Sequence, residues 1–101
     1  MQAKSSTHAS VLPAAIATGR CEVRAGCMAT EVSVDASGKA TGVVYRGPDG
    51  QSHFQPAKVV VLACTAVESA RLLLISRSGR FPNGLANGSG LVGKNLVFSG
   101  L

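Results

Sequence analysis

The feature that most constrains the fold is an apolar run that leads straight into a helical pattern, over residues 58–74. Residues 59–64 read VVVLAC, which is typical of a strand buried on both faces in a parallel sheet. Thr65 and Glu68 then stand three positions apart, which is the spacing of a capping box at the start of a helix. The sequence therefore predicts a buried strand that turns directly into a capped helix.

The predicted helix begins at Ala66 and ends near Ser76, and its face carries Val67, Ala70 and Leu74 at helical spacing. We expect that face to pack against the sheet. A strand that feeds a helix N-terminus leaves unpaired N–H groups and the positive end of the helix dipole at the carboxyl edge of the sheet. In α/β proteins this edge is where nucleotides bind.

An antiparallel β-meander is predicted upstream of this unit. Strands are expected at residues 28–34, 42–46 and 51–55, with a further short strand at residues 21–24. The turn sequences ASGK at residues 36–39 and GPDG at residues 47–50 separate the main strands. Strands joined by such short turns pair as neighbours in one sheet.

The chain divides by sequence into a loop and helix, the meander, the strand–helix unit and a final loop, at residues 1–20, 21–56, 57–77 and 78–101. Residues 1–7 are expected to be irregular, and the first helix to cover residues 11–18 with Gly19 as its stop. Residues 76–93 are rich in glycine, serine and asparagine. So long an irregular loop is unusual in a small domain, which suggests a connection to a further domain.

The charge pattern disfavours a nucleic-acid binder, although a small basic binding protein remains a weaker alternative. The net charge is +5, from ten Lys and Arg against five Asp and Glu, and aromatic residues make up only 4%. Nucleic-acid binders usually gather basic residues on one face and add aromatic side chains for stacking. No segment of the sequence is long and apolar enough to be expected to span a membrane.

The cysteines and histidines form no recognisable metal-binding or catalytic pattern. Cys21, Cys27 and Cys64 lack metal-ligand spacing, and their odd number argues against a disulfide framework. Cys64 lies in the apolar run and is expected to be a small core residue. His8 and His53 have no partner at a suitable spacing, so both are expected at the surface.

Four stretches of the chain carry a resemblance to a known family. They are AKSST at residues 3–7 with LPA at 12–14, EVRAGCMATEV at 22–32, VVLACTAVESARLLL at 60–74, and FPNGLANGSGLVGKNL at 81–96. In this order and spacing they resemble an internal segment of the glucose–methanol–choline (GMC) flavoprotein oxidoreductases. Within that family they look most like the branch of gluconate and fructose dehydrogenase large subunits.

The resemblance implies an α/β fold: a partial FAD/NAD(P)-binding, Rossmann-like domain with an antiparallel β-meander, one buried parallel strand and flanking helices. It implies that the main chain near Ala29 hydrogen-bonds the adenine ring of FAD. It also implies that Ala63, Cys64 and Thr65 lie against the ribose or pyrophosphate, beside the helix N-terminus. The family generally has glycine where Thr65 stands, and glycine allows a close backbone approach.

The resemblance further implies a fragment of an FAD-dependent oxidoreductase, a dehydrogenase or oxidase acting on the CH–OH group of an alcohol or sugar. No GxGxxG appears after an early strand, so the family's main pyrophosphate-binding turn is absent, and neither His8 nor His53 matches the family's catalytic histidine. We therefore expect the chain to contribute to the flavin site, to supply no catalytic group and to be inactive alone. The alternative is a non-catalytic subunit or truncated module that pairs with a partner chain supplying the missing half-domain.

Overall fold

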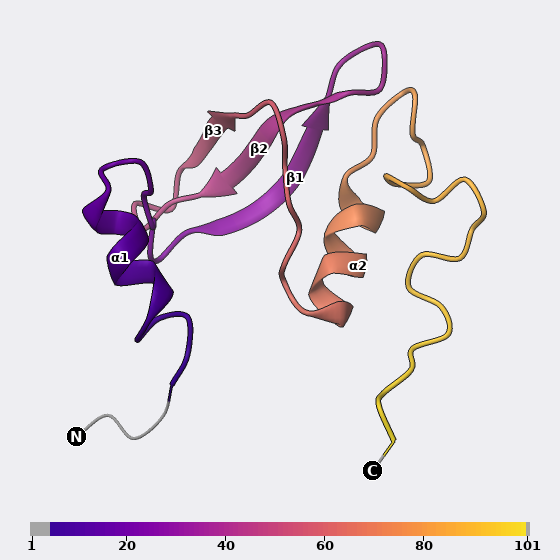
Figure 1. Cartoon of the computed structure of the whole chain (residues 1–101). Coiled ribbons are helices and arrows are strands. Elements are labelled where there is room, and N and C mark those ends of the chain that lie inside the picture. The colour runs from indigo at the N-terminus through magenta and orange to yellow at the C-terminus, as the bar shows by residue number, and fades with distance from the viewer. Residues whose placement is uncertain (1–4, 101) are drawn as a thin grey trace.

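Three antiparallel strands and two helices make up the regular structure of residues 5–100, the part of the chain that the computed structural model describes. They occur in the order α1 (Val11–Ala17), β1 (Met28–Val34), β2 (Ala40–Arg46), β3 (Ser52–Pro56) and α2 (Ala66–Ile75). The strand order in the sheet is β1-β2-β3. Figure 1 shows α2 beside β1, while α1 lies at the other end of the sheet.

The expected β-meander is confirmed, and its turns are held by local chemistry. The Asp35 side chain accepts hydrogen bonds from the backbone N–H groups of Ser37 and Lys39, at 2.9 and 3.0 Å. In the next turn, the Asp49 side chain accepts a hydrogen bond from the backbone N–H of Gln51 at 2.9 Å. Both turns also contain a glycine with positive φ, at +87° and +75°. These contacts lie within each turn, so the turns pair the strands as expected.

Both predicted helices are confirmed in place and length. The first ends at Ala17, and Gly19 follows with a φ of +73°, donating its N–H to the carbonyl of Ile16 at 3.0 Å. Glycine in this left-handed conformation commonly stops a helix. The irregular stretch expected at residues 1–7 lies partly outside the described residues.

The face of α2 that packs on the sheet is not the one expected. Leu72 is only 3% exposed, whereas Val67 is 59% exposed and the side chains of Ala70 and Leu74 are half-buried. This position follows from the place of α2 beside β1, because the Ser76 hydroxyl bonds both the carbonyl of Leu72 and the backbone N–H of Val32. The expectation that Val67, Ala70 and Leu74 form the sheet-facing side is therefore wrong.

The buried strand expected at residues 59–64 does not form. This segment has no regular structure, and Val59 and Val61 are 77% and 81% exposed. Cys64, expected in the core, is exposed as well. A strand needs another strand to pair with, and within residues 5–100 the three strands of the meander pair only with one another. The short strand expected at residues 21–24 is also absent, and those residues form a loop.

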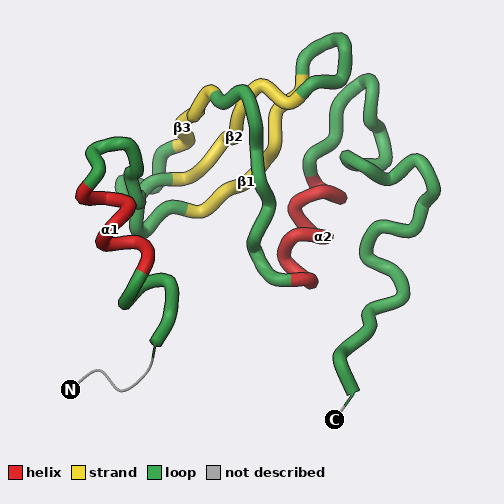
Figure 2. Tube along the Cα trace, in the orientation of Figure 1, coloured by secondary structure: helices red, strands yellow, loops and turns green. Residues whose placement is uncertain are grey.

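The chain is more open than a compact domain of its mass. It exposes 7909 Å² of surface, where roughly 5300 Å² is expected for a compact protein of this size. Its radius of gyration is 16.3 Å, against about 13 Å for a typical domain of similar length. Figure 2 shows that the described chain beyond α2 is entirely loop. In the described part of the chain, no helix has the length and apolar character needed to cross a membrane.

Candidate functional site

The start of α2 is built differently from the expected capping box. The Thr65 side chain makes no capping hydrogen bond, and Thr65 itself has φ 69° and ψ 166°. The backbone N–H of Cys64 instead donates to the Ser69 hydroxyl at 3.1 Å. Glu68 accepts a 2.8 Å hydrogen bond from Arg71, so its carboxylate is directed along the helix. The capping-box prediction is therefore wrong, because the Thr65 backbone leaves the conformation in which its hydroxyl could cap.

This arrangement leaves the first turn of α2 open to a ligand. The first helical hydrogen bond runs from the N–H of Ser69 to the carbonyl of Thr65, at 2.9 Å. The N–H groups of Ala66, Val67 and Glu68 precede it and have no partner within the helix. These residues are exposed, and the positive end of the helix dipole lies beside them. Such a terminus favours a phosphate or another anion.

The residues that lead into this turn are small and exposed. Ala63, Cys64 and Thr65 all lie at the surface, so no bulky side chain of theirs closes the approach to the helix end. The N–H of Cys64 is already engaged by Ser69, which leaves its carbonyl and side chain for other contacts. The positive φ of Thr65 is a conformation that glycine adopts much more readily than threonine.

Ala29, the fourth candidate residue, lies near the start of β1 and pairs with Tyr45 on β2. The next residue, Thr30, is an extra residue in the strand, and its hydroxyl donates to the carbonyl of Val44 at 3.2 Å. This is a β-bulge, which increases the local twist. Since β1 is at the edge of the sheet, the N–H and C=O groups on its outer side are not paired with another strand, although the Val32 N–H donates to the Ser76 hydroxyl. Those groups are the donors and acceptors that an adenine edge requires.

The two parts of the candidate site lie on different elements. Residues 57–65 cross from the β3 edge of the sheet to the β1 edge, where α2 begins (Figure 1). Residues 63–65 thus lead into α2, which lies beside the strand that carries Ala29. Among residues 5–100, no hydrogen bond connects Ala29 to residues 63–65.

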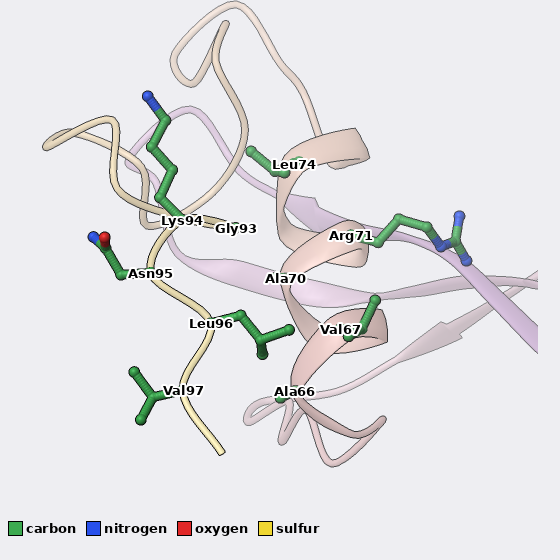
Figure 3. Close-up of a pocket in the computed structure, with 10 residues that line it drawn as sticks. All are labelled: Ala66, Val67, Ala70, Arg71, Leu74, Gly93, Lys94, Asn95, Leu96 and Val97. Atoms are coloured by element: carbon green, nitrogen blue, oxygen red, sulfur yellow. The ribbon is translucent and has the colours of Figure 1, made fainter.

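A groove of about 620 Å³ between α2 and the C-terminal loop was not anticipated from the sequence. It is lined by Ala66, Val67, Ala70, Arg71, Leu74 and residues 93–97. Leu96 points from the loop toward α2, whereas the charged ends of Arg71 and Lys94 point away (Figure 3). The groove is therefore mainly apolar, and its floor is the helix face that was expected to contact the sheet.

Comparison with known proteins identifies the family. The protein-family model described as GMC oxidoreductase matches residues 1–99. The chain therefore belongs to the GMC oxidoreductase family. The matched segment falls in the FAD-binding region of that family. The family and the FAD cofactor expected from the resemblance are thus confirmed.

Several curated relatives are similar to the chain over part of their length. The 2-methyl-1,2-propanediol dehydrogenase of Mycolicibacterium austroafricanum is 40% identical over 86 residues, covering 84% of this chain and 15% of the relative. The gluconate 2-dehydrogenase flavoprotein of Pantoea cypripedii is 30% identical over 102 residues, covering 100% of this chain and 16% of the relative. The fructose dehydrogenase large subunit of Gluconobacter japonicus is 39% identical over 66 residues, covering 65% of this chain and 12% of the relative. The chain thus spans a small part of these relatives.

The residues present are chemically compatible with the adenosine diphosphate half of FAD. A diphosphate requires backbone N–H groups and positive potential, and both occur at the start of α2. An adenine ring requires a donor and an acceptor side by side, which the free edge of β1 can supply. Sequence reasoning identified these two places but missed Ser69, because nothing in a helical run marks a serine that will bind back to the preceding loop.

Proposed function

We propose that this chain is a piece of the FAD-binding domain of an oxidoreductase that acts on the CH–OH group of an alcohol or sugar. The observation that carries the proposal is the open first turn of α2, preceded by exposed small residues, within a chain that matches the GMC family over residues 1–99. In this proposal, residues 1–20, 21–56 and 57–77 are the successive parts of that domain. Residues 78–101 lead toward a substrate domain.

Each candidate residue has a defined role in this proposal. The main chain of Ala29 hydrogen-bonds the adenine edge, while Ala63, Cys64 and Thr65 lie against the ribose or pyrophosphate. The N–H groups at the start of α2 stabilise the diphosphate charge. When bound, FAD supplies the hydride acceptor for oxidation of the alcohol carbon.

The chain provides nucleotide-binding groups rather than catalytic ones. His53 is exposed and hydrogen-bonds the Asp49 carboxylate at 3.0 Å, and it stacks on Tyr45 with ring centroids 5.4 Å apart. His8 is exposed on the loop before α1. Neither histidine lies on an element of the candidate nucleotide site, so neither is placed to take a proton from a substrate there.

The direct test combines flavin binding with turnover. We expect the purified chain to change the fluorescence of added FAD saturably, because binding of the adenosine half alters the stacking of adenine on the flavin ring. We expect no oxidation of gluconate, fructose or simple diols with a dye as electron acceptor. Turnover above that of free FAD would contradict the proposed division of roles, and the absence of a saturable change in fluorescence would contradict the binding role.

A second candidate function is a non-catalytic module that pairs with a partner chain. The extended apolar segment favours it, since Val59 and Val61 are 77% and 81% exposed and strands from a partner could cover them. Sedimentation velocity and urea unfolding at several protein concentrations distinguish the two candidates. A midpoint that rises with concentration supports pairing, whereas a monomer that unfolds cooperatively at a constant midpoint contradicts it.

A further inference from the structure

The loop before β1 is fixed to the sheet by one arginine. The Nε of Arg24 donates to Oε1 of Glu22 at 2.8 Å, and its Nη2 donates to Oε2 of Glu22 at 3.3 Å. Its Nη1 donates to the Tyr45 hydroxyl at 3.1 Å and to Oε1 of Gln55 at 2.7 Å. A single side chain therefore joins its own loop to β2 and to β3.

Stacking and charge reinforce these hydrogen bonds. The guanidinium carbon of Arg24 lies 5.7 Å from the centroid of the Tyr45 ring, within the range of a cation–π interaction. Hydrogen bonding and charge attraction raise the pKa of Arg24 and lower the pKa of Glu22. The pair thus stabilises the charged form of each group. Each of the three guanidinium nitrogens of Arg24 donates to at least one protein acceptor, which fits a structural connection.

The network acts on the start of β1. Tyr45, which receives the Arg24 contact, is the cross-strand partner of Ala29. Between Arg24 and Ala29 the chain turns at Gly26, whose φ is +68° and where an added Cβ would lie 3.2 Å from Pro48. Hydrogen bonds from Arg24 thus hold the loop, and Gly26 packs close to Pro48. Both residues lie shortly before β1, the bulged strand that carries Ala29.

We infer that Arg24 is a positioning residue for the adenine contact at Ala29, an inference that rests on the proposed function. It touches no nucleotide. It orients the first residues of β1 through Tyr45 and Gln55, so that the free edge of the strand meets an adenine ring in a fixed geometry. The pyrophosphate position at the start of α2 lies on another element and does not depend on this network.

Two partial ligands separate this role from a general effect on folding. The full chain, labelled with ¹⁵N, is titrated with AMP and separately with inorganic pyrophosphate, while the amide signals of Ala29, Thr65 and Ala66 are followed. The variants are Arg24→Met and Arg24→Lys. The matched control is Arg46→Met, since Arg46 is exposed and its side chain forms no hydrogen bond or ion pair with residues 5–100.

We expect Arg24→Met to weaken AMP binding by roughly tenfold, as for the loss of charge-assisted hydrogen bonds that position a site. Pyrophosphate binding, read at Thr65 and Ala66, should change by less than about twofold, the size of a marginal surface-charge effect. Arg24→Lys retains the charge but cannot reach all three partners, so it should also lose AMP affinity. The control should bind both ligands as the unmodified chain does.

The remaining outcomes contradict either the role of Arg24 or the proposed function. Unchanged AMP affinity in a folded Arg24→Met or Arg24→Lys chain contradicts the role of Arg24 and leaves the proposed function standing. Equal losses for AMP and pyrophosphate show that Arg24 only maintains the fold, which also contradicts the positioning role. If the unmodified chain binds neither ligand, the proposed function itself fails.

Discussion

The hydroxyl of Ser76 joins α2 to β1 through Val32. It accepts a hydrogen bond from the backbone N–H of Val32 at 2.9 Å and donates one to the carbonyl of Leu72 at 2.7 Å. Ser76, Val32 and Leu72 are all buried, at 2%, 6% and 3% exposure. Since β1 is an edge strand, this N–H would otherwise be unpaired where the helix covers it.

Replacing Ser76 should therefore destabilise the contact between helix and sheet. Ser76→Ala leaves the Val32 N–H buried without a partner, so the free energy of unfolding should fall by about 1–3 kcal/mol. Urea unfolding followed by circular dichroism measures the change. Ser52→Ala, at an exposed position of β3, is the control and should alter stability little. Equal stability of the two variants would contradict the role assigned to Ser76.

Gly84 packs closely against the backbone of α2. A Cβ added there would lie 2.6 Å from the Leu73 carbonyl oxygen and 2.8 Å from the Leu74 Cα, and φ is +92°. Gly84→Ala should therefore reduce the free energy of unfolding by about 2–4 kcal/mol. Gly79→Ala is the matched control, because no atom lies within 4 Å of its added Cβ. A loss in Gly79→Ala as large as in Gly84→Ala would mean that close packing is not the cause.

Thr65 should gain stability when replaced by glycine. Its φ of 69° and ψ of 166° fall in a region where a residue with a Cβ is strained. Relief of that strain outweighs the added freedom of the unfolded chain, so Thr65→Gly should raise the free energy of unfolding by about 1 kcal/mol. Thr65→Ala keeps a Cβ and should give no such gain. A less stable Thr65→Gly chain, measured by thermal unfolding, would contradict the assigned strain.

The turn carboxylates predict a loss of stability in acid. Backbone N–H donation from Gln51, followed by the bond to His53, lowers the pKa of Asp49 from 3.8. The Ser37 hydroxyl, followed by the N–H of Lys39, lowers the pKa of Asp35. A lowered folded pKa contributes stability above the unfolded value, and that stability is lost as pH falls through the folded value.

The Tm should accordingly be constant from neutral pH to about pH 4, near the ordinary aspartate pKa, and then fall. The double variant Asp35→Asn, Asp49→Asn should have a lower Tm at neutral pH and a shallower decline in acid. A Tm that rises below pH 4, or a decline unaltered in the double variant, would contradict this account.

The elements whose structure is determined by residues within one short segment were predictable from the sequence. The turns at residues 36–39 and 47–50 contain their own aspartate acceptors and glycines, so their chemistry does not depend on distant residues. The helix expected to run from Ala66 to near Ser76 is observed at Ala66–Ile75, because its pattern of apolar residues lies within one segment.

Two of the predictions that failed concern features that depend on residues distant in the sequence. An apolar run forms a strand only where another strand pairs with it, and residues 59–64 have no such partner among residues 5–100. The sheet-facing side of α2 depends on where β1 lies, which helical spacing alone does not specify. The prediction of a capping box failed for a different reason. Thr65 has a positive φ, and the spacing of Thr65 and Glu68 in the sequence does not reveal that backbone conformation.

The most direct test of the central claim is to map where each half of FAD binds. Amide spectra of the ¹⁵N-labelled chain are recorded with ADP and separately with FMN. If the chain carries the adenosine diphosphate part of the flavin site, ADP should shift the signals of Ala29, Thr65 and Ala66, and FMN should leave Ala29 unchanged. Shifts by ADP confined to other residues, or none at saturating ADP, would contradict the account.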